Sequence, residues 1–337
     1  MKATEFEYEL PRSRIASRPL FRRDSSRLMV VDRRRGSIVH RRFRELDAIL
    51  QPDDLLVLND TRVMPLRLFG RKSTGGELEL LLCRELEGGL WLALGRASNP
   101  FRKGQILIIE GGAEAEVVGV ESGGFVIVRF RGGIDVLDFC RKHGHTPLPP
   151  YIGRPDVPSD AERYQTVFAR RPASCAAPTA GLHFTHRLLH RLALAGIRTA
   201  YVTLHVGPGT FRPISSENIE DHALEAEPYE IPMETVLAIY RAKSVGARVV
   251  ACGTTVTRAL ETWAKSGKLK GSTDLFIYPG FEFKVVDVLI TNFHLPRSSL
   301  LLLVCAFASK ELVMRAYREA IDRDYRFYSY GDAMIVL

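Results

Sequence analysis

Short apolar runs separated by pairs of glycines occupy the middle of this chain, and no other feature constrains its fold as strongly. Between residues 68 and 150 the runs recur at a spacing of roughly ten residues, which is typical of antiparallel strands joined by tight turns. We therefore expect residues 68–150 to form a small all-β unit, either an antiparallel β-barrel or a sandwich. The expected strands are Leu78 to Cys83, Leu90 to Leu94, Gln105 to Ile109, Ala115 to Val120 and Phe125 to Phe130.

On both sides of this segment strands and helices alternate, which indicates a layered α/β domain with a mixed sheet. A hairpin is expected over residues 27–41, and a buried strand that starts near residue 53 ends on the polar pair Asn59 and Asp60. We expect residues 1–67 and 151–337 to fold together as one discontinuous domain, with residues 68–150 inserted. After residue 150 the expected helices are Thr185 to Ala195, Met233 to Val245 and Thr255 to Lys265, and the expected strands are Arg198 to Val206, Arg248 to Cys252, Leu275 to Tyr278 and Val285 to Thr291.

Positive charge is concentrated at the N-terminus. The formal net charge is +8, and the first 45 residues hold thirteen basic and six acidic side chains. Clustered guanidinium groups attract a polyanion such as RNA, although a solvated surface without a specific partner explains the charge equally well. The RNA-binding candidates are Arg12, Arg14, Arg22, Arg23, Arg33, Arg34 and Arg35.

Several protein classes are not favoured by the sequence. No stretch approaches the ~18 consecutive apolar residues of a membrane span, and residues 1–10 lack the apolar core of a secretory signal, so we expect a cytoplasmic protein without a membrane partner. Five scattered cysteines without a CxxC pair argue against a disulfide framework and against a zinc site. We therefore expect no bound metal.

Two segments combine small residues with a histidine at the edge of an expected element. Residues 176–185 carry Thr179, Gly181 and His183 just before a helix, where free amides favour an anion. A tight turn with a packed histidine and a threonine N-cap is the alternative. Residues 203–211 lead a strand through His205 into a Gly-Pro-Gly turn, which is either a place of close ligand approach or a plain turn. The candidates from this turn are Gly207, Gly209 and Thr210.

Three further segments offer polar or aromatic groups. Gly253, Thr254 and Thr255 join a buried strand to a helix, and either an anion site or an ordinary capped turn fits them. Residues 290–299 place Asn292 and His294 between apolar runs, which indicates a buried polar network or a recognition surface. The aromatic tail, residues 325–332, could stack on bases, although core packing is the more frequent use of such residues.

Taken together, these segments and several others resemble the S-adenosylmethionine:tRNA ribosyltransferase-isomerase family over essentially the whole chain. Chance agreement of so many ordered strings is negligible. The matching strings are FEYELP (6–11), LVLNDTRV (56–63), HTPLPPYI (145–152), RYQT (163–166), residues 176–185, residues 204–211, residues 253–255, LFIYPG (275–280), residues 291–296 and residues 325–332.

The resemblance implies an α/β domain with an inserted β-barrel. It also implies that the ribosyl part of S-adenosylmethionine is transferred and isomerised onto a 7-aminomethyl-7-deazaguanine in the anticodon loop of tRNA, giving epoxyqueuosine and releasing adenine and methionine. S-adenosylmethionine is then a consumed substrate, and we expect no other cofactor. We expect a monomer whose partners are tRNA and S-adenosylmethionine.

Some residues depart from the family pattern. In the usual HxMHxE string, His222 and Glu227 match, whereas Glu225 stands where a second histidine is common. Val256 replaces a usual serine, and Cys175 and Leu66 are milder substitutions. A role that the family gives to that second histidine is therefore in doubt here.

The implied chemistry needs a base that titrates near neutrality, because the sulfonium acidifies the protons of the 5′ carbon and the attacking amine must be neutral. We expect His183 or His205 to serve, with His294 and Glu227 as further catalytic candidates, and we expect His183, His205 and Asn292 to share one cavity. The substrate-binding candidates are Asn59, Asp60, Arg62, Thr179, Gly181, Gly207, Gly209, Thr210, Gly253, Thr254, Thr255 and Asn292.

Three other functions compete with this interpretation. A methyltransferase would share the substrate, but the usual glycine-rich loop after an early strand is missing from residues 55–63. A noncatalytic tRNA-binding protein explains the arginines but not the imidazoles at strand ends. A tRNA-guanine transglycosylase acts on the same nucleotide but resembles a zinc-bearing barrel, whose cysteine cluster this chain lacks.

Overall fold

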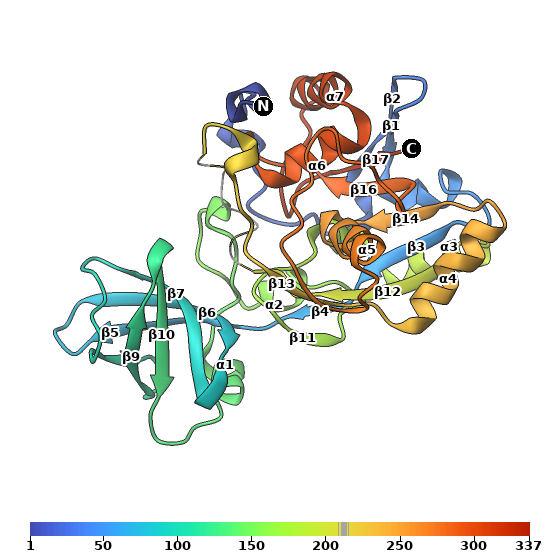
Figure 1. Ribbon diagram of the computed structural model, residues 1–337. Coiled ribbons are helices and arrows are strands. Elements are labelled where there is room, and N and C mark those ends of the chain that lie inside the picture. The colour runs from blue at the N-terminus through green and yellow to red at the C-terminus, as the bar shows by residue number, and fades with distance from the viewer. Residues whose placement is uncertain (208, 210–213, 215) are drawn as a thin grey trace.

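One mixed sheet of nine strands forms the larger part of the molecule in the computed structural model, which describes residues 1–207, 209, 214 and 216–337 (Figure 1). The outer strands on either side come from opposite ends of the chain, so both flanks of the central segment contribute to one sheet. In spatial order the strands are β15 (Lys270–Thr273), β13 (Glu227–Glu230), β12 (Arg198–Leu204), β3 (Leu55–Asn59), β14 (Val249–Cys252), β16 (Val288–Asn292), β17 (Ala333–Val336), β1 (Arg27–Asp32) and β2 (Ser37–Arg42).

Four adjacent strands at the centre of the sheet run parallel. β12 and β14 both pair with β3, and β16 pairs with β14, so the carboxyl ends of all four lie along one edge. The register places Val57 of β3 beside Ala200 and Ala251. β3 is buried along its whole length and is apolar up to its last residue, Asn59, as expected for a parallel strand covered on both faces.

The two faces of the sheet bury separate hydrophobic cores, because successive side chains of a strand point to opposite faces. Val57 and Ala251 belong to the core under one set of helices, whereas Leu56 and Val250 belong to the other core. The first core packs α4 (Met233–Ser244), α5 (Thr254–Ser266), α6 (Ser299–Ala308) and α7 (Lys310–Asp322). The second packs α3 (His186–Leu194) and the 3-10 helix η4 (Phe43–Ala48).

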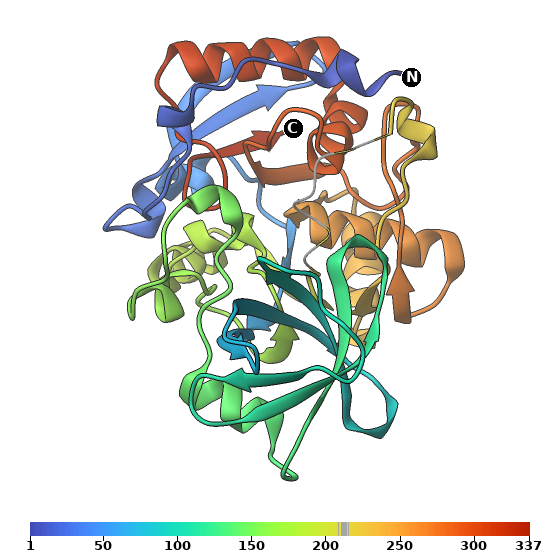
Figure 2. The same ribbon diagram turned by 90° about the vertical axis from the view of Figure 1, so that its left-hand side faces the viewer.

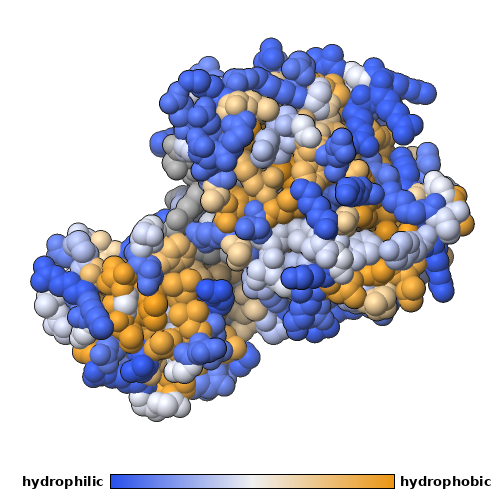
Figure 3. Space-filling model, in the orientation of Figure 1, coloured by the Kyte–Doolittle hydropathy of each residue, from blue (hydrophilic) through white to orange (hydrophobic). Residues whose placement is uncertain are grey.

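The central segment forms a closed antiparallel barrel, which stands as a separate lobe beside the sheet (Figures 1 and 3). Its wall needs Gly70, because a Cβ there would lie 2.3 Å from the carbonyl oxygen of Ile108 on the neighbouring strand. The expected fold class, a layered α/β domain with a mixed sheet plus a small antiparallel barrel, is confirmed. In order around the barrel the strands are β10 (Phe125–Phe130), β7 (Leu90–Ala97), β6 (Glu77–Glu85), β5 (Arg67–Lys72), β8 (Ile106–Ile109) and β9 (Glu114–Val120).

Short elements connect the barrel to the sheet (Figure 2). β4 (Thr61–Val63) leaves the end of β3 and pairs in parallel with β11 (Arg171–Ser174). Helix α1 (Val136–His143) follows the last barrel strand and starts at the N-cap Asp135, and α2 (Asp160–Arg163) lies on the return path. No helix within the described residues is long and apolar enough to cross a membrane.

One expected strand is wrong. Residues 275–278 do not form a strand. The strand that pairs with β13 is β15, which ends just before these residues. Ile277 is buried in the core, and the carbonyl of Leu275 accepts a hydrogen bond from the Arg258 guanidinium at 3.0 Å. Residues 275–278 are apolar because they pack into the core. The backbone carbonyl of Leu275 bonds to the Arg258 side chain and not to a neighbouring strand.

Candidate functional site

Polar residues from distant parts of the chain meet at the carboxyl edge of the four parallel strands. Asn59 ends β3, His205 follows β12, Gly253 follows β14 and Asn292 ends β16. In an open α/β sheet this edge is where ligands usually bind. The strand order, rather than any single motif, therefore places these candidates together.

Asn59 joins three of these elements. Its side-chain amide donates to the carbonyl of Leu204 at 2.9 Å and to the Thr255 hydroxyl at 3.2 Å, and its oxygen accepts from the amides of Thr61 and Leu204, both at 3.1 Å. The residue is 1% exposed. A fully bonded buried amide of this kind holds the ends of β3 and β12 and the start of α5 in fixed positions.

His205 is held by the chain that follows β3. Its Nδ1 lies 2.8 Å from the Thr61 hydroxyl, and the neighbouring Asp60 accepts a hydrogen bond from Thr203 at 2.6 Å. Partial burial lowers the pKa of His205, and the negative charge of Asp60 opposes that shift. The imidazole is therefore neutral near pH 7 and able to accept a proton.

His183 and Asn292 form a second, fully buried group. The Asn292 amide donates to His183 Nε2 at 3.1 Å, so Nε2 accepts and Nδ1 carries the hydrogen that it donates to the Ser26 hydroxyl at 2.8 Å. Burial lowers the pKa of His183 to about 4. The side-chain oxygen of Asn292 has no hydrogen-bond partner among the described residues, although Asn292 is 1% exposed.

His294 is also packed into the interior. Its Nε2 lies 2.7 Å from the Thr291 hydroxyl, and its backbone amide donates to the Tyr317 hydroxyl at 3.1 Å. Burial lowers the pKa of His294 to about 3. Its ring therefore stays neutral across the physiological range.

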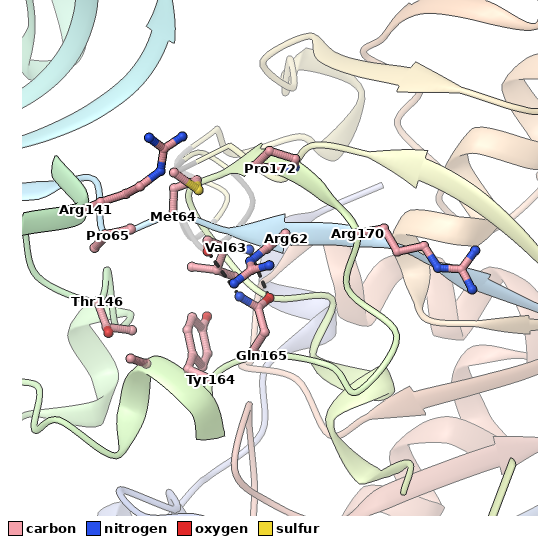
Figure 4. Close-up of a pocket in the computed structure, with 11 residues that line it drawn as sticks. Arg62, Val63, Met64, Pro65, Arg141, Thr146, Tyr164, Gln165, Arg170 and Pro172 are labelled. Atoms are coloured by element: carbon pink, nitrogen blue, oxygen red, sulfur yellow. Dashed lines mark hydrogen bonds between the residues drawn. The ribbon is translucent and has the colours of Figure 1, made fainter. Parts of the chain in front are cut away.

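Two sizeable cavities lie where the barrel meets the sheet. The larger one has a volume of about 450 Å³ and is bordered by His205, Gly207 and Glu227 on the sheet side and by Trp91 and Phe125 of the barrel. The smaller one, of about 370 Å³, is shown in Figure 4. Both volumes are in the range of small-molecule sites.

The smaller cavity is lined by polar groups of several connecting elements (Figure 4). Arg62 comes from β4, Arg141 from α1 and Arg170 from the segment before β11. Gln165 fixes the β4 backbone by accepting from the amide of Val63 at 3.0 Å and donating to its carbonyl at 3.1 Å. The backbone next to Arg62 is therefore held in place by the Gln165 side chain.

The structure does not bring His183, His205 and Asn292 into one cavity. Asn292 borders a void of about 20 Å³ together with Thr179 and His294, and His183 borders another of about the same size. Only His205 faces the larger cavity. Two strands separate the two groups, because β3 and β14 lie between β12 and β16 in the sheet.

The remaining substrate-binding candidates have different surroundings. Gly181 lies where a Cβ would come within 2.9 Å of Phe168 and Thr166, so its lack of a side chain serves packing. Gly209 lies against the Glu225 carboxylate. Thr254 and Thr255 are buried in the first turn of α5, directly after Gly253. Thr210 lies outside the described residues.

Glu227 is engaged in a buried ion pair. One carboxylate oxygen contacts the Arg258 guanidinium, and the other accepts from the amide of Gly207 at 2.7 Å. The side chains of Glu227 and Arg258 are 4% and 5% exposed. This carboxylate therefore ties the turn after β12 to helix α5.

The seven candidate arginines divide into bonded and exposed groups. Arg14 pairs with Asp324, Arg23 donates to the carbonyls of Gln165 and Glu162, and Arg33 donates to the carbonyls of Phe307 and Asp287. These three side chains are held by the protein itself. The exposed members are Arg12, Arg22, Arg34 and Arg35, of which Arg35 also lies 3.8 Å from the Asp32 carboxylate.

Three of the exposed arginines lie at two opposite edges of the sheet. Arg22 precedes β1, whose first residues pair with the start of β17 beside Asn292, so it lies near the carboxyl edge. Arg34 and Arg35 follow β1 and lie at the other edge. A strand of six residues separates the two groups by about 20 Å.

The aromatic tail is not available for stacking on bases. Tyr325, Phe327, Tyr328 and Tyr330 are each 6% exposed or less. Phe327 packs against Phe293 with ring centroids 5.0 Å apart. Core packing therefore accounts for these rings.

Sequence reasoning missed the barrel side of the larger cavity. Trp91 and Leu92 are consecutive residues of β7 and Phe125 is the first residue of β10, so no local motif marks them. Arg141 and Arg170 likewise lie outside the N-terminal cluster of arginines. Only the packing of the barrel against the sheet shows that these residues face the candidate site. Among the described residues, no group of three potential metal ligands is found.

The fold is that of an α/β protein with a closed antiparallel barrel, and polar strand ends lie beside cavities where the barrel meets the sheet. The model of the family described as "Queuosine biosynthesis protein" matches residues 3–336. The chain belongs to that family.

Similar proteins match over their full length. An S-adenosylmethionine:tRNA ribosyltransferase-isomerase of Anaeromyxobacter dehalogenans (strain 2CP-C) is 50% identical over 344 residues, covering all of this chain and 99% of the relative. The protein of the same name from Thermotoga maritima is 51% identical over 340 residues, covering 100% of both. The crystal structure of an S-adenosylmethionine tRNA ribosyltransferase from Thermotoga maritima matches with a TM-score of 0.57 and 41% identity, covering 99% of this chain and 100% of that one.

Proposed function

We propose that this chain transfers and isomerises the ribosyl part of S-adenosylmethionine onto 7-aminomethyl-7-deazaguanine in tRNA, giving epoxyqueuosine and releasing adenine and methionine. The observation that carries this conclusion is about 50% identity, over the full length, to relatives named S-adenosylmethionine:tRNA ribosyltransferase-isomerase. S-adenosylmethionine is then a substrate, and the RNA partner is the anticodon loop. The proposal is also supported by His205, a neutral histidine that borders the larger cavity and can act as a base.

His205 is the group that we assign to proton removal. With the Thr61 hydroxyl accepting from Nδ1–H, the Nε2 lone pair is free to take a proton from the 5′ carbon beside the sulfonium. No described residue bonds to Nε2, and the ring borders a cavity large enough for a nucleoside. Asp60 tunes the basicity of this ring through its charge.

The other catalytic candidates are assigned positioning roles. Glu227 holds the turn that follows His205, and His183 with Asn292 holds the segment around Thr179 against the end of β16. His294 supports the same sheet edge from inside. The rings of His183 and His294 are buried and hydrogen-bonded within the protein, and the Glu227 carboxylate is paired with Arg258, so we assign none of them to proton removal.

The RNA-contacting residues, the oligomeric state, the cellular location and the domain bounds are also proposals, and the first set has fewer residues than the sequence suggested. We assign RNA contact to Arg12 and Arg22, because they are exposed and precede β1. Arg34 and Arg35 lie at the far sheet edge and are left out. We propose a monomer that acts in the cytoplasm, where its tRNA substrate is found. We also propose domain bounds of 1–67 and 151–337 for the α/β domain and 68–150 for the inserted barrel, since all six barrel strands lie between residues 67 and 130.

The proposal is tested by incubating the purified protein with S-adenosylmethionine and tRNA carrying the aminomethyl base. Free adenine is measured by chromatography, and the modified nucleoside by mass spectrometry. His205→Ala is expected to lower the rate of adenine release about 100-fold or more, because general-base catalysis contributes at least that much. His190→Ala, an exposed histidine on α3, is the matched control and is expected to match the unmodified enzyme.

One result would contradict the proposed reaction, and another would contradict the assignment of His205 as the base. Methylated RNA without adenine release would identify a methyltransferase instead. A full rate of adenine release with His205→Ala would remove this residue from the chemistry while leaving the reaction itself intact.

A further inference from the structure

Strands β4 and β11 form a two-stranded arginine ribbon beside the proposed base. Their register places Arg171 next to Thr61, whose hydroxyl lies 2.8 Å from His205 Nδ1. Burial lowers the pKa of His205, and the positive charge of Arg171 adds to that shift. Arg62 is the next residue of β4 and is exposed. The arginine ribbon therefore begins at the proposed base and carries positive charge away from it.

The charges of the ribbon are available to a ligand. Arg62 and Arg171 are exposed, and none of the described residues bonds to either guanidinium group. Arg170, directly before β11, is exposed as well and lies over the Tyr201 ring at 4.6 Å. Arginine forks match phosphate oxygens in a way that lysine does not, so these side chains suit a phosphate-bearing partner.

Acidic residues are sparse in the segments that build the ribbon. Residues 163–216, which include β11, contain no aspartate or glutamate. Asp60, just before β4, is 7% exposed and accepts a hydrogen bond from Thr203 inside the protein. Glu162, an exposed residue of α2, is the acid that precedes the acid-free stretch. The local excess of guanidinium groups attracts a polyanion, which gains free energy by releasing its condensed counterions.

The loop before β1 extends this surface with an aromatic ring. Arg23 of the loop donates to the carbonyl of Gln165 at 2.5 Å, and the Gln165 side chain bonds to both backbone groups of Val63 on β4. Figure 2 shows the N-terminal segment next to the segment around α2. The same loop holds Arg22, which is exposed, and Phe21, which is 94% exposed. A free ring and a free charge therefore lie on a loop that is bonded to the ribbon.

The arginines are spread along the surface and do not converge on one point. Figure 4 shows Arg62 beside Gln165, with Arg141 and Arg170 on opposite sides of them. A single small anion is bound by converging donors, whereas charges spread along a surface match the successive phosphates of an RNA chain. The exposed ring of Phe21 offers a face on which an unpaired base stacks. The pattern indicates RNA with unpaired bases rather than a small anion.

We propose that the arginine ribbon and the loop that holds Phe21 and Arg22 form one binding surface for the anticodon loop of the RNA substrate. Phosphates contact Arg62 and Arg171, and an unpaired base stacks on Phe21. Because the ribbon starts at Thr61, RNA bound along it lies beside His205. This inference rests on the proposed function and adds to it the surface that holds the RNA.

The surface is tested by equilibrium binding of an RNA hairpin with the anticodon stem and loop over a series of salt concentrations. Arg62→Ala and Arg171→Ala are each expected to weaken binding about five- to eightfold at about 0.1 M salt, and to lower the slope of log Kd against log salt by about 0.7–0.9, because each removes one phosphate contact. Arg62→Lys keeps the charge and is expected to keep the slope. The matched control is Arg34→Ala, an exposed arginine of the N-terminal cluster at the far sheet edge, and it is expected to bind as the unmodified protein does.

A second measurement separates RNA contact from a structural effect. Arg62→Ala is expected to bind S-adenosylmethionine as the unmodified protein does in calorimetry. With intact tRNA, its adenine release should have a raised KM for tRNA and an unchanged kcat. Circular dichroism spectra identical to those of the unmodified protein establish that each variant is folded.

The outcomes separate this inference from the proposed function. Unmodified protein that does not bind the hairpin contradicts the proposed function itself. If the unmodified protein binds the hairpin, a salt slope that Arg62→Ala and Arg171→Ala leave unchanged overturns the proposed surface, and so does an equal loss of binding with Arg34→Ala. Loss of S-adenosylmethionine binding in Arg62→Ala would overturn it as well, because the arginine would then belong to the small-molecule site.

Discussion

The buried ion pair between Glu227 and Arg258 connects the turn after β12 to helix α5, and its removal should have a large and measurable cost. Arg258 also donates to the carbonyls of Leu275 and Thr273, both at 3.0 Å. Glu227→Gln keeps the shape of the side chain but leaves the guanidinium buried without a counter-charge. Breaking one partner of a buried pair costs about 3–5 kcal/mol, so we expect a loss of that size in the free energy of unfolding.

A matched control lies on the same strand. Glu230 ends β13 and pairs with Lys270, whose side chain is 79% exposed. Glu230→Gln makes the same chemical change at an exposed pair, and we expect it to cost less than about 1 kcal/mol, because solvent screens such pairs. Urea unfolding followed by the fluorescence of Trp263 on α5, in a Trp91→Phe background, reports on the sheet alone.

A double variant isolates the charge effect. Combining Glu227→Gln with Arg258→Met removes both charges, and we expect it to be more stable than the sum of the single losses predicts. If Glu227→Gln is no more harmful than Glu230→Gln, the carboxylate is not the counter-charge of Arg258, and the structural role assigned to it is refuted.

Three further predictions concern histidines and an exposed ring. The acid limb of kcat/KM against pH should have its midpoint below about 6.5, because burial lowers the pKa of His205. Asp60→Asn should move this midpoint lower still, because it removes the negative charge that raises the pKa of His205. An upward shift of the midpoint would contradict the assignment of His205. Phe21 is 94% exposed, so Phe21→Ala should weaken binding of an RNA hairpin with the anticodon stem and loop by about 1–3 kcal/mol through lost base stacking. Leu194 is 75% exposed, and Leu194→Ala should leave this binding unchanged. Equal binding by both variants would count against stacking by Phe21. Burial lowers the pKa of His183 to about 4, so its neutral form stabilises the fold above pH 6.5. The free energy of unfolding should therefore drop by up to about 3 kcal/mol between pH 6.5 and 4. A His183→Gln variant with the same pH dependence would refute this prediction.

Local patterns in the sequence were sufficient for the class of fold. The glycine-punctuated runs predicted the barrel because each run is long enough for one strand and each double glycine permits a tight turn; all five expected runs overlap observed barrel strands. The buried strand that ends at Asn59 and the helix capped by Thr185 were also predicted from the sequence. Both depend on local properties, which are the pattern of apolar residues and the capping residue. Residues 275–278 were misjudged because an apolar run records burial and not the identity of its backbone partner.

Tertiary structure alone decided which candidates border a sizeable cavity. Strand order separates His205 from His183 and Asn292, although all three follow or end an apolar segment in the same way. The ring of His183 is fully bonded inside, whereas that of His205 borders a cavity whose other wall is the barrel. Trp91 and Arg170 became part of the site through packing between segments far apart in the chain. Such long-range packing leaves no periodic signal in the residues that take part, so the sequence determined the elements and the assembled sheet and barrel determined the site.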